Sequence, residues 1–213
     1  MAQKDIGNRI PIHTLNTTEQ VKDFYNEWGI KDKYNQDMLE WNYTGPIEAA
    51  HIFNNYAHDK DMLIFDAGCG SGLVGKALKE VGYSNLQGAD LSQTLLESIP
   101  KNLYKKLSQS DLNEPLDISD NSFDAVMCVG TFTYGHLKAE VLDEFVRITK
   151  NEGLICFTVN EGIYEEYGFD TKIAALETQN NWCKLALYKF DYLASKDVHA
   201  WLGLYQVIKV SDS

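Results

Sequence analysis

The chain has 213 residues, of which 44% are hydrophobic and 23% are charged, so it is long enough to form one globular domain with an ordinary core. Its formal net charge of −12 argues against a nucleic-acid-binding surface, which needs a basic patch. No apolar run approaches the roughly 20 residues of a membrane span, and residues 1–5 lack the basic and apolar regions of a signal peptide. We therefore expect a cytoplasmic protein with no nucleic-acid or membrane partner.

The cysteine and histidine residues do not have the spacing of a metal site. The four cysteines contain no C-x-x-C pair, and each lies in or beside an apolar segment: Cys69, Cys128, Cys156 and Cys183. We expect them to be buried, reduced thiols. The histidines are scattered, at positions 13, 51, 58, 136 and 199. The sequence predicts that no metal is bound.

Residues 1–60 predict a polar arm followed by helices that form an N-terminal cap. The segment Thr17-Thr18-Glu19-Gln20 has the spacing of a capping box, and the helix that it begins ends at Gly29. Another helix begins at Gly45-Pro46, because proline fits the first helical position, and runs to about His58.

From residue 62 the pattern alternates between strand and helix. The expected strands cover residues 62–66, 86–90, 104–108, 123–129 and 154–159, and the expected helices follow the first strand, begin at Ser92, and cover residues 136–150. Apolar strands separated by helices are typical of a parallel sheet that is covered on both faces. Residues 61–160 are therefore expected to form the core of an α/β fold.

The amino-acid pattern of residues 161–213 differs from that of the preceding segment and includes more aromatic residues. A helix is expected at 171–180, and two long alternating segments, 182–192 and 199–210, are typical of antiparallel strands. We interpret residues 1–213 as a single domain, in which 161–213 form a substrate-side insert and the last strands.

The stretch Ile64-Phe65-Asp66-Ala67-Gly68-Cys69-Gly70-Ser71-Gly72 predicts a strand, a tight turn and the start of a helix. Glycine tolerates positive φ and has no Cβ, so a ligand can lie against the bare backbone of such a turn. The free N–H groups of the following helix point at that ligand. The turn therefore predicts a nucleotide-type binding site, although a glycine-rich loop without a ligand has the same pattern.

Two nucleotides fit this turn. Gly70-x-Gly72-x-x-Gly75, with Asp90 20 residues on, matches the dinucleotide fingerprint of an NAD-dependent reductase. However, the turn begins at Gly68, and an NAD frame would then need a glycine where Leu73 stands. Asp66 at the strand end can approach an ammonium group, which S-adenosylmethionine has and NAD lacks. These points favour S-adenosylmethionine.

Acidic residues also follow the next strands. Asp90 can accept hydrogen bonds from both ribose hydroxyls, and Asp111 can accept one from the adenine amino group. Cys128-Val129-Gly130 places backbone and small side chains beneath the ligand. Ligands of open α/β sheets bind at these carboxyl ends.

The chain resembles class I S-adenosylmethionine-dependent methyltransferases over residues 62–160. The motifs that carry the resemblance are Asp66-Ala67-Gly68-Cys69-Gly70-Ser71-Gly72, Gly88-Ala89-Asp90-Leu91-Ser92, Phe123-Asp124-Ala125-Val126 and Gly153-Leu154-Ile155. The resemblance implies a Rossmann-like, seven-stranded, mostly parallel sheet in the order 3-2-1-4-5-7-6, with the last strand antiparallel and helices on both faces.

A narrower resemblance is to the methyltransferase-like proteins of the Williams–Beuren region. It rests on Tyr25-Asn26-Glu27-Trp28, Tyr34-Asn35-Gln36-Asp37 and Gly130-Thr131-Phe132-Thr133-Tyr134-Gly135-His136. The family tends to have Asp where Asn26 and Asn35 stand. Together, residue chemistry and resemblance assign the cofactor site to Trp28, Tyr34, Asp66, Gly68, Cys69, Gly70, Gly72, Asp90, Leu91, Asp111, Leu112, Cys128 and Val129.

The methyl acceptor is expected beyond the fourth strand, beneath the cap and the 161–180 segment. His136, a candidate general base, and Tyr134 are the candidate catalytic residues, but both also fit a packing role. Glu161, Tyr164 and Glu165 follow the fifth strand and fit either a substrate edge or a solvated acidic helix. Several aromatic residues would suit a flat or cationic acceptor, or belong to the core: Phe132, Tyr134, Tyr164, Tyr167 and Trp182.

The leading hypothesis is a metal-independent methyltransferase that uses S-adenosylmethionine, releases S-adenosylhomocysteine, and methylates oxygen or nitrogen of a small molecule by in-line transfer. Three alternatives remain open. The chain could bind the cofactor without turnover, methylate a protein, or be the NAD-dependent reductase described above.

Overall fold

The computed structural model describes residues 14–15, 17–135 and 137–209. Seven strands form the sheet: β1 (Ile64–Ala67), β2 (Leu86–Asp90), β3 (Lys106–Gln109), β4 (Phe123–Phe132), β5 (Thr149–Asn160), β6 (Trp182–Leu193) and β7 (Val198–Val207). The helices around it are α1 (Thr18–Gly29), α2 (Lys33–Glu40), α3 (Gly45–Tyr56), α4 (Leu73–Glu80), α5 (Gln93–Ser98), α6 (Val141–Ile148) and α7 (Phe169–Thr178).

The strand order is β3-β2-β1-β4-β5-β7-β6, which confirms the expected Rossmann-like sheet. The first five strands in this order pair in parallel, and β7 runs antiparallel to both β5 and β6. The carboxyl ends of β1 to β5 therefore meet at one edge of the sheet. β1 is buried along its whole length, as expected of a central strand with helices on both faces.

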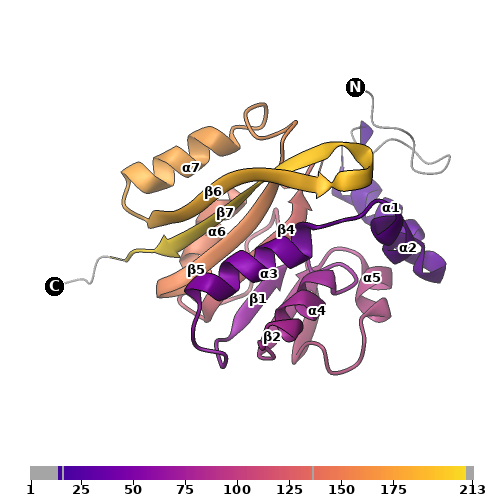
Figure 1. Cartoon of the computed structure of the whole chain (residues 1–213), viewed down its shortest axis with the longest axis horizontal. Coiled ribbons are helices and arrows are strands. Elements are labelled where there is room, and N and C mark those ends of the chain that lie inside the picture. Colours follow the sequence, from indigo (N-terminus) through magenta and orange to yellow (C-terminus); the bar gives the residue numbers. More distant parts are fainter. Residues whose placement is uncertain (1–13, 16, 136, 210–213) are drawn as a thin grey trace.

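Two separate hydrophobic cores pack on opposite faces of the sheet. Because side chains alternate along a strand, Ile64 and Ala125 enter the core with α3 and α4, whereas Phe65 and Val126 enter the core with α6 and α7. Figure 1 shows α3, α4 and α5 in front of the sheet and α6 behind it. Alternate side chains of β1 and β4 thus pack into the cores on the two opposite faces of the sheet.

The N-terminal helices α1 and α2 form a cap with its own apolar cluster. Thr17 caps α1, and its side chain accepts a hydrogen bond from the Gln20 N–H, as the capping-box spacing predicts. The Trp28 indole packs in the cluster and donates a 2.8 Å hydrogen bond to Asp37 of α2. The cap contacts α5 and lies beyond the carboxyl ends of the strands.

One helix begins later than the sequence predicts. The apolar spacing predicts a helix from His136, but α6 begins at Val141. Gly135 has a φ of +74, which is not helical. The N–H groups of Val141 and Leu142 donate to the carbonyl oxygens of Lys138 and Ala139, three residues back, so this segment forms turns in place of an α-helix. Leu137 is buried all the same, so its place in the apolar pattern reflects packing of a loop.

The cysteines are free thiols, as expected. Cys69, Cys128 and Cys156 are buried, whereas Cys183 is only partly buried. Phe132 and Trp182 both lie in the core with α6 and α7, each 1% exposed. Of the two interpretations that the sequence leaves open for these aromatic residues, the structure favours packing.

Candidate functional site

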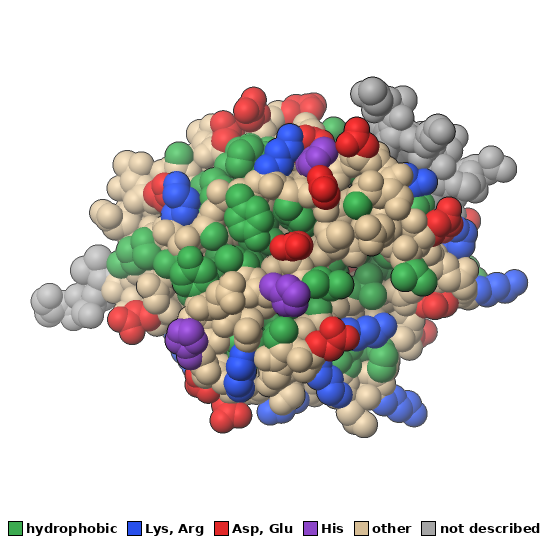
Figure 2. Space-filling view, viewed as in Figure 1, with side chains coloured by type: hydrophobic (Ala, Val, Ile, Leu, Met, Phe, Trp, Pro, Cys, Tyr) green, Lys and Arg blue, Asp and Glu red, His purple; other side chains and the backbone are tan. Residues whose placement is uncertain are grey.

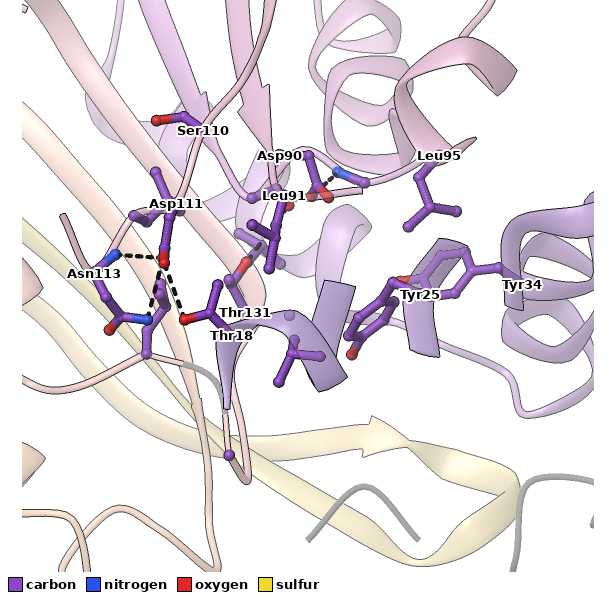
Figure 3. Close-up of a pocket in the computed structure, with 18 residues that line it drawn as sticks. Thr18, Tyr25, Tyr34, Asp90, Leu91, Leu95, Ser110, Asp111, Asn113 and Thr131 are labelled. Carbon is purple, nitrogen blue, oxygen red and sulfur yellow. Dashed lines mark hydrogen bonds between the residues drawn. The ribbon is translucent and has the colours of Figure 1, made fainter. Parts of the chain in front are cut away.

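A pocket opens at the carboxyl ends of β1, β2 and β4 and beside the loop that follows β3, beneath the cap. Eight of its lining residues belong to the set proposed from sequence: Tyr34, Gly68, Gly70, Asp90, Leu91, Asp111, Leu112 and Val129. Figure 3 shows that Tyr25 and Tyr34 of the cap lie on one side of this pocket and Asp111 on the other, with Asp90 between them.

The glycine turn after β1 depends on glycine at defined positions. Gly68, Gly70 and Gly72 have φ values of +77, +51 and +83, a region that other residues rarely adopt. A Cβ on Gly68 would lie 2.2 Å from Thr131 Oγ1, whereas one on Gly70 would meet its nearest atom at 4.0 Å. The turn is therefore packed at Gly68 and open at Gly70, where a ligand has room.

Asp90, at the end of β2, holds the turn to the next strand. One carboxylate oxygen accepts a 2.8 Å hydrogen bond from the Gly70 N–H, and the other accepts a 2.8 Å bond from the Ser92 N–H. Burial raises the pKa of Asp90, and the backbone N–H groups of Ser92, Gly70 and Leu91 offset part of that rise. Each oxygen retains capacity for a further donor, because a carboxylate has about four lone-pair sites.

Asp111 joins the loop after β3 to the cap. Its Oδ1 accepts a 2.9 Å hydrogen bond from the Asn113 N–H, and its Oδ2 accepts a 3.0 Å bond from the Thr18 hydroxyl (Figure 3). Further along the cap, Asn26 accepts a 2.8 Å hydrogen bond from the Ser92 hydroxyl. Two polar contacts thus fasten α1 over the pocket.

The cap also supplies two tyrosine rings. Tyr25 and Tyr34 line the pocket, and their ring centroids are 6.3 Å apart. Burial raises the pKa of Tyr34, and the nearby Tyr192 and Asp90 raise it further. Both phenols therefore offer protonated hydroxyls and ring faces to a ligand, because burial raises the pKa of Tyr25 as well.

Asp66 does not line the pocket. Its carboxyl is fully buried beneath the turn, where it accepts a 2.5 Å hydrogen bond from the Tyr104 hydroxyl, and that hydroxyl accepts a 3.1 Å bond from the Gly75 N–H. Burial raises the pKa of Asp66 to about 7. Asp66 and Tyr104 together therefore support the first turn of α4, and Asp66 is not among the residues that line the pocket.

Four other residues proposed from sequence also lie outside the lining: Trp28, Cys69, Gly72 and Cys128. Trp28, Cys69 and Cys128 are buried, Trp28 inside the cap. Gly72 precedes α4 in a left-handed conformation. They shape the elements around the pocket without facing it.

Of the two candidate catalytic residues, the structure describes only Tyr134. His136 lies outside the described residues. Tyr134 lies beside the pocket, next to Gly135 of the lining, and a Cβ on Gly162 would lie 1.9 Å from its hydroxyl. Burial, followed by the charges of Glu166 and Glu161, raises the pKa of Tyr134, so its phenol stays protonated at neutral pH.

Gly130, which the sequence places beneath the ligand, also lines the pocket. Nine further lining residues were not predicted from the sequence: Thr18, Val21, Tyr25, Leu95, Ser110, Asn113, Thr131, Gly135 and Leu137. Tyr25, Thr131 and Gly135 belong to the motifs that carry the family resemblance, so the sequence contained a signal for them. Thr18 and Val21 carry no such signal, because they reach the pocket only through the docking of α1.

In the described ranges, no group of three or more histidine, cysteine, aspartate or glutamate side chains is arranged to hold a metal ion. None of the helices in the same ranges is long and apolar enough to cross a membrane.

Comparison with known proteins agrees with this geometry. A family model described as a methyltransferase domain matches residues 65–157, from β1 into β5. The chain is 34% identical over 162 residues to an uncharacterized protein of Methanocaldococcus jannaschii, a match that covers 73% of this chain and 68% of that protein. A crystal structure of an S-adenosylmethionine-dependent methyltransferase from Mesorhizobium loti shares the fold, with a TM-score of 0.58 and 16% identity over 74% of this chain and 97% of that one.

The chain belongs to the class I S-adenosylmethionine-dependent methyltransferases, as the methyltransferase-domain match and the relatives together show, and its sheet order agrees. Within this family it is similar to methyltransferase-like protein 27 of Homo sapiens, at 29% identity over 188 residues, which cover 85% of this chain and 76% of that protein. The resemblance noted in the sequence is thereby confirmed.

Proposed function

We propose that this chain transfers the methyl group of S-adenosylmethionine to a small-molecule acceptor. The observation that carries the proposal is the pocket in which the open glycine turn, Asp90 and Asp111 come together beneath the cap. These groups come from the ends of β1, β2 and β3, where ligands of open α/β sheets bind.

The donors and acceptors of the pocket match those of the cofactor. Asp90 has lone pairs left for the two ribose hydroxyls after binding two backbone N–H groups. Asp111 has lone pairs left for the adenine amino group. The space at Gly70 lets the methionine part lie against backbone. The residues present therefore fit S-adenosylmethionine.

When bound, the cofactor supplies a methyl group on a sulfonium: a lone pair of the acceptor forms the new bond to the methyl carbon, and the electrons of the broken C–S bond stay on sulfur. The task of this chain is to align the acceptor and to exclude water. The cap, through Tyr25 and Tyr34, would close the pocket. Tyr134 would orient the acceptor by donating a hydrogen bond, and His136 is the proposed base where the acceptor must lose a proton.

Calorimetry with S-adenosylmethionine and S-adenosylhomocysteine tests the cofactor assignment. We expect both to bind at roughly micromolar concentration, as is common for enzyme ligands, and NADH to give no heat and no displacement. A chain that binds NADH in competition with S-adenosylmethionine, or binds neither, would contradict the assignment.

Transfer itself is tested by following S-adenosylhomocysteine release across a panel of small amines, phenols and carboxylic acids. Turnover with a small acceptor supports the proposal. Cofactor binding without turnover, or turnover only with protein acceptors, would replace it with one of the alternatives that the sequence leaves open.

A further inference from the structure

A second hollow, of about 350 Å³, lies at the same edge of the sheet as the cofactor pocket. It is formed where β5 ends and where β6 and β7 approach their connection, and its lining includes Glu161, Glu165, Glu166, Tyr164 and Trp201. In Figure 2, acidic, basic and histidine side chains gather over this end of the β6–β7 hairpin. We call it the acidic hollow.

Tyr134 adjoins both the acidic hollow and the cofactor pocket. Gly130 and Gly135, on either side of Tyr134 in sequence, line the cofactor pocket, while the Tyr134 hydroxyl touches Gly162 in the hollow. The contact depends on Gly162 because any side chain there would collide with the phenol. The hollow and the cofactor pocket therefore lie next to the same tyrosine side chain.

Two aromatic side chains, those of Tyr164 and Trp201, belong to the lining of the hollow. The rings of Tyr164 and Trp201 are stacked, with centroids 4.9 Å apart and planes 26° apart. Tyr167, 40% exposed, makes an edge contact with Tyr134 at 6.3 Å. Ring faces attract cations through their quadrupole, and tryptophan does so best.

The charge of the hollow is negative. Three carboxylates and one ammonium group, that of Lys189, belong to its lining. Lys189 is already paired with Glu161, which also accepts a 3.2 Å hydrogen bond from the His199 N–H. Although burial alone would raise the pKa of Glu161, these hydrogen bonds and the charge of Lys189 hold it below its usual range.

The carboxylates of Glu165 and Glu166 remain available. Both side chains are exposed, and within the described residues neither takes part in an ion pair. Two uncommitted negative charges beside stacked aromatic rings form a combination that recognises organic cations, because each contributes an attraction that a neutral molecule of the same shape does not feel.

We propose that the acidic hollow binds an alkylammonium group of the methyl acceptor, held between the Tyr164–Trp201 stack and the carboxylates of Glu165 and Glu166. The inference rests on the proposed function for the acceptor role, and it concerns the group that is recognised. The atom that receives the methyl group is a different atom of the same molecule, one that has a lone pair, since an ammonium nitrogen has none.

The test uses the full chain labelled with ¹⁵N at tryptophan, which gives one indole signal for each of the four tryptophans. Trp201→Phe assigns the signal of Trp201. Titration with choline should shift that signal in a saturable way and leave the other three unchanged. The neutral isostere 3,3-dimethylbutan-1-ol should bind about 10-fold more weakly.

Charge-removing variants locate the site. Glu165→Gln with Glu166→Gln should weaken choline binding about 5- to 10-fold. Glu80→Gln with Glu97→Gln, which changes the charge equally at exposed positions of α4 and α5, should leave it unchanged. The unshifted indole signals of the double variants show that each is folded.

Equal binding of choline and its neutral isostere, or no saturable shift up to roughly 50 mM choline, would overturn the inference. Cofactor binding is measured separately by calorimetry. If S-adenosylmethionine binds but choline does not, the inference fails and the proposed function stands; if choline binds but S-adenosylmethionine does not, the proposed function fails.

Discussion

Replacing Asp90 with asparagine removes one negative charge from the centre of the cofactor pocket while keeping the size of the side chain. In the structure both carboxylate oxygens already accept a backbone N–H, from Gly70 and from Ser92. An asparagine can accept only one of these bonds and must turn its NH₂ group toward the other donor. The variant should therefore perturb the turn as well as the ribose contact.

The magnitude follows from the bonds at stake. A hydrogen bond to a charged group contributes about 1.5–3 kcal/mol, and 1.4 kcal/mol is a factor of ten in affinity. Loss of one such bond to ribose should weaken S-adenosylmethionine binding roughly 10- to 100-fold. Calorimetry measures the affinity, and thermal unfolding without ligand reports damage to the turn.

Asp117→Asn is the matched control, because Asp117 is exposed and does not line the pocket. It should leave the affinity unchanged. If Asp90→Asn binds S-adenosylmethionine as tightly as the unmodified chain does, the assignment of Asp90 to the ribose is refuted. A loss of affinity equal in both variants would instead point to overall charge.

Two further predictions concern the glycine turn and its support. Gly68→Ala should lower the unfolding temperature and abolish cofactor binding, because a Cβ at position 68 collides with Thr131. Gly70→Ala meets no such collision and should lower the free energy of unfolding by only about 1–2 kcal/mol, through its left-handed backbone. Equal effects of the two variants in thermal unfolding would refute this reasoning. Burial raises the pKa of Asp66 from 3.8 to about 7. Between pH 3.8 and about 7, the unfolded chain therefore releases a proton that the folded chain keeps. As a result, the free energy of unfolding should fall as pH rises through this range. Urea unfolding of Asp66→Asn should lack that slope, and an identical slope in the variant would assign it to other groups.

The topology of the sheet and the location of the pocket could be predicted because both follow from local patterns. The glycines at every second position after β1 need positive φ whatever surrounds them, and all three have it. Asp90 and Asp111 line the pocket because Asp90 ends β2 and Asp111 follows β3 by two residues, and parallel strands end at one edge of the sheet. These features are set by a few adjacent residues.

The remaining features depend on contacts between distant segments. Asp66 is also at a strand end, but its orientation is decided by Tyr104, 38 residues away. Thr18 meets Asp111 across 93 residues of chain, so only the docked cap brings it to the pocket. The predicted start of α6 at His136 is wrong, because Leu137 fits the apolar pattern of a helix but is buried as part of a loop. The spacing of apolar residues therefore predicts which side chains are buried more reliably than it predicts whether the backbone is helical.

The separate apolar cluster of the cap has a consequence for the dynamics of the protein. Trp28 packs with Phe24 and Met38 inside the cap. Among the described residues, no buried side chain of this cluster belongs to the two cores on the sheet, although Leu73 and Tyr134 pack against it from outside the cap. Regions with a small core of their own open locally at a lower free-energy cost than the whole domain. On the proposed function, local opening of the cap while the sheet stays folded would provide a route for exchanging a bulky spent cofactor.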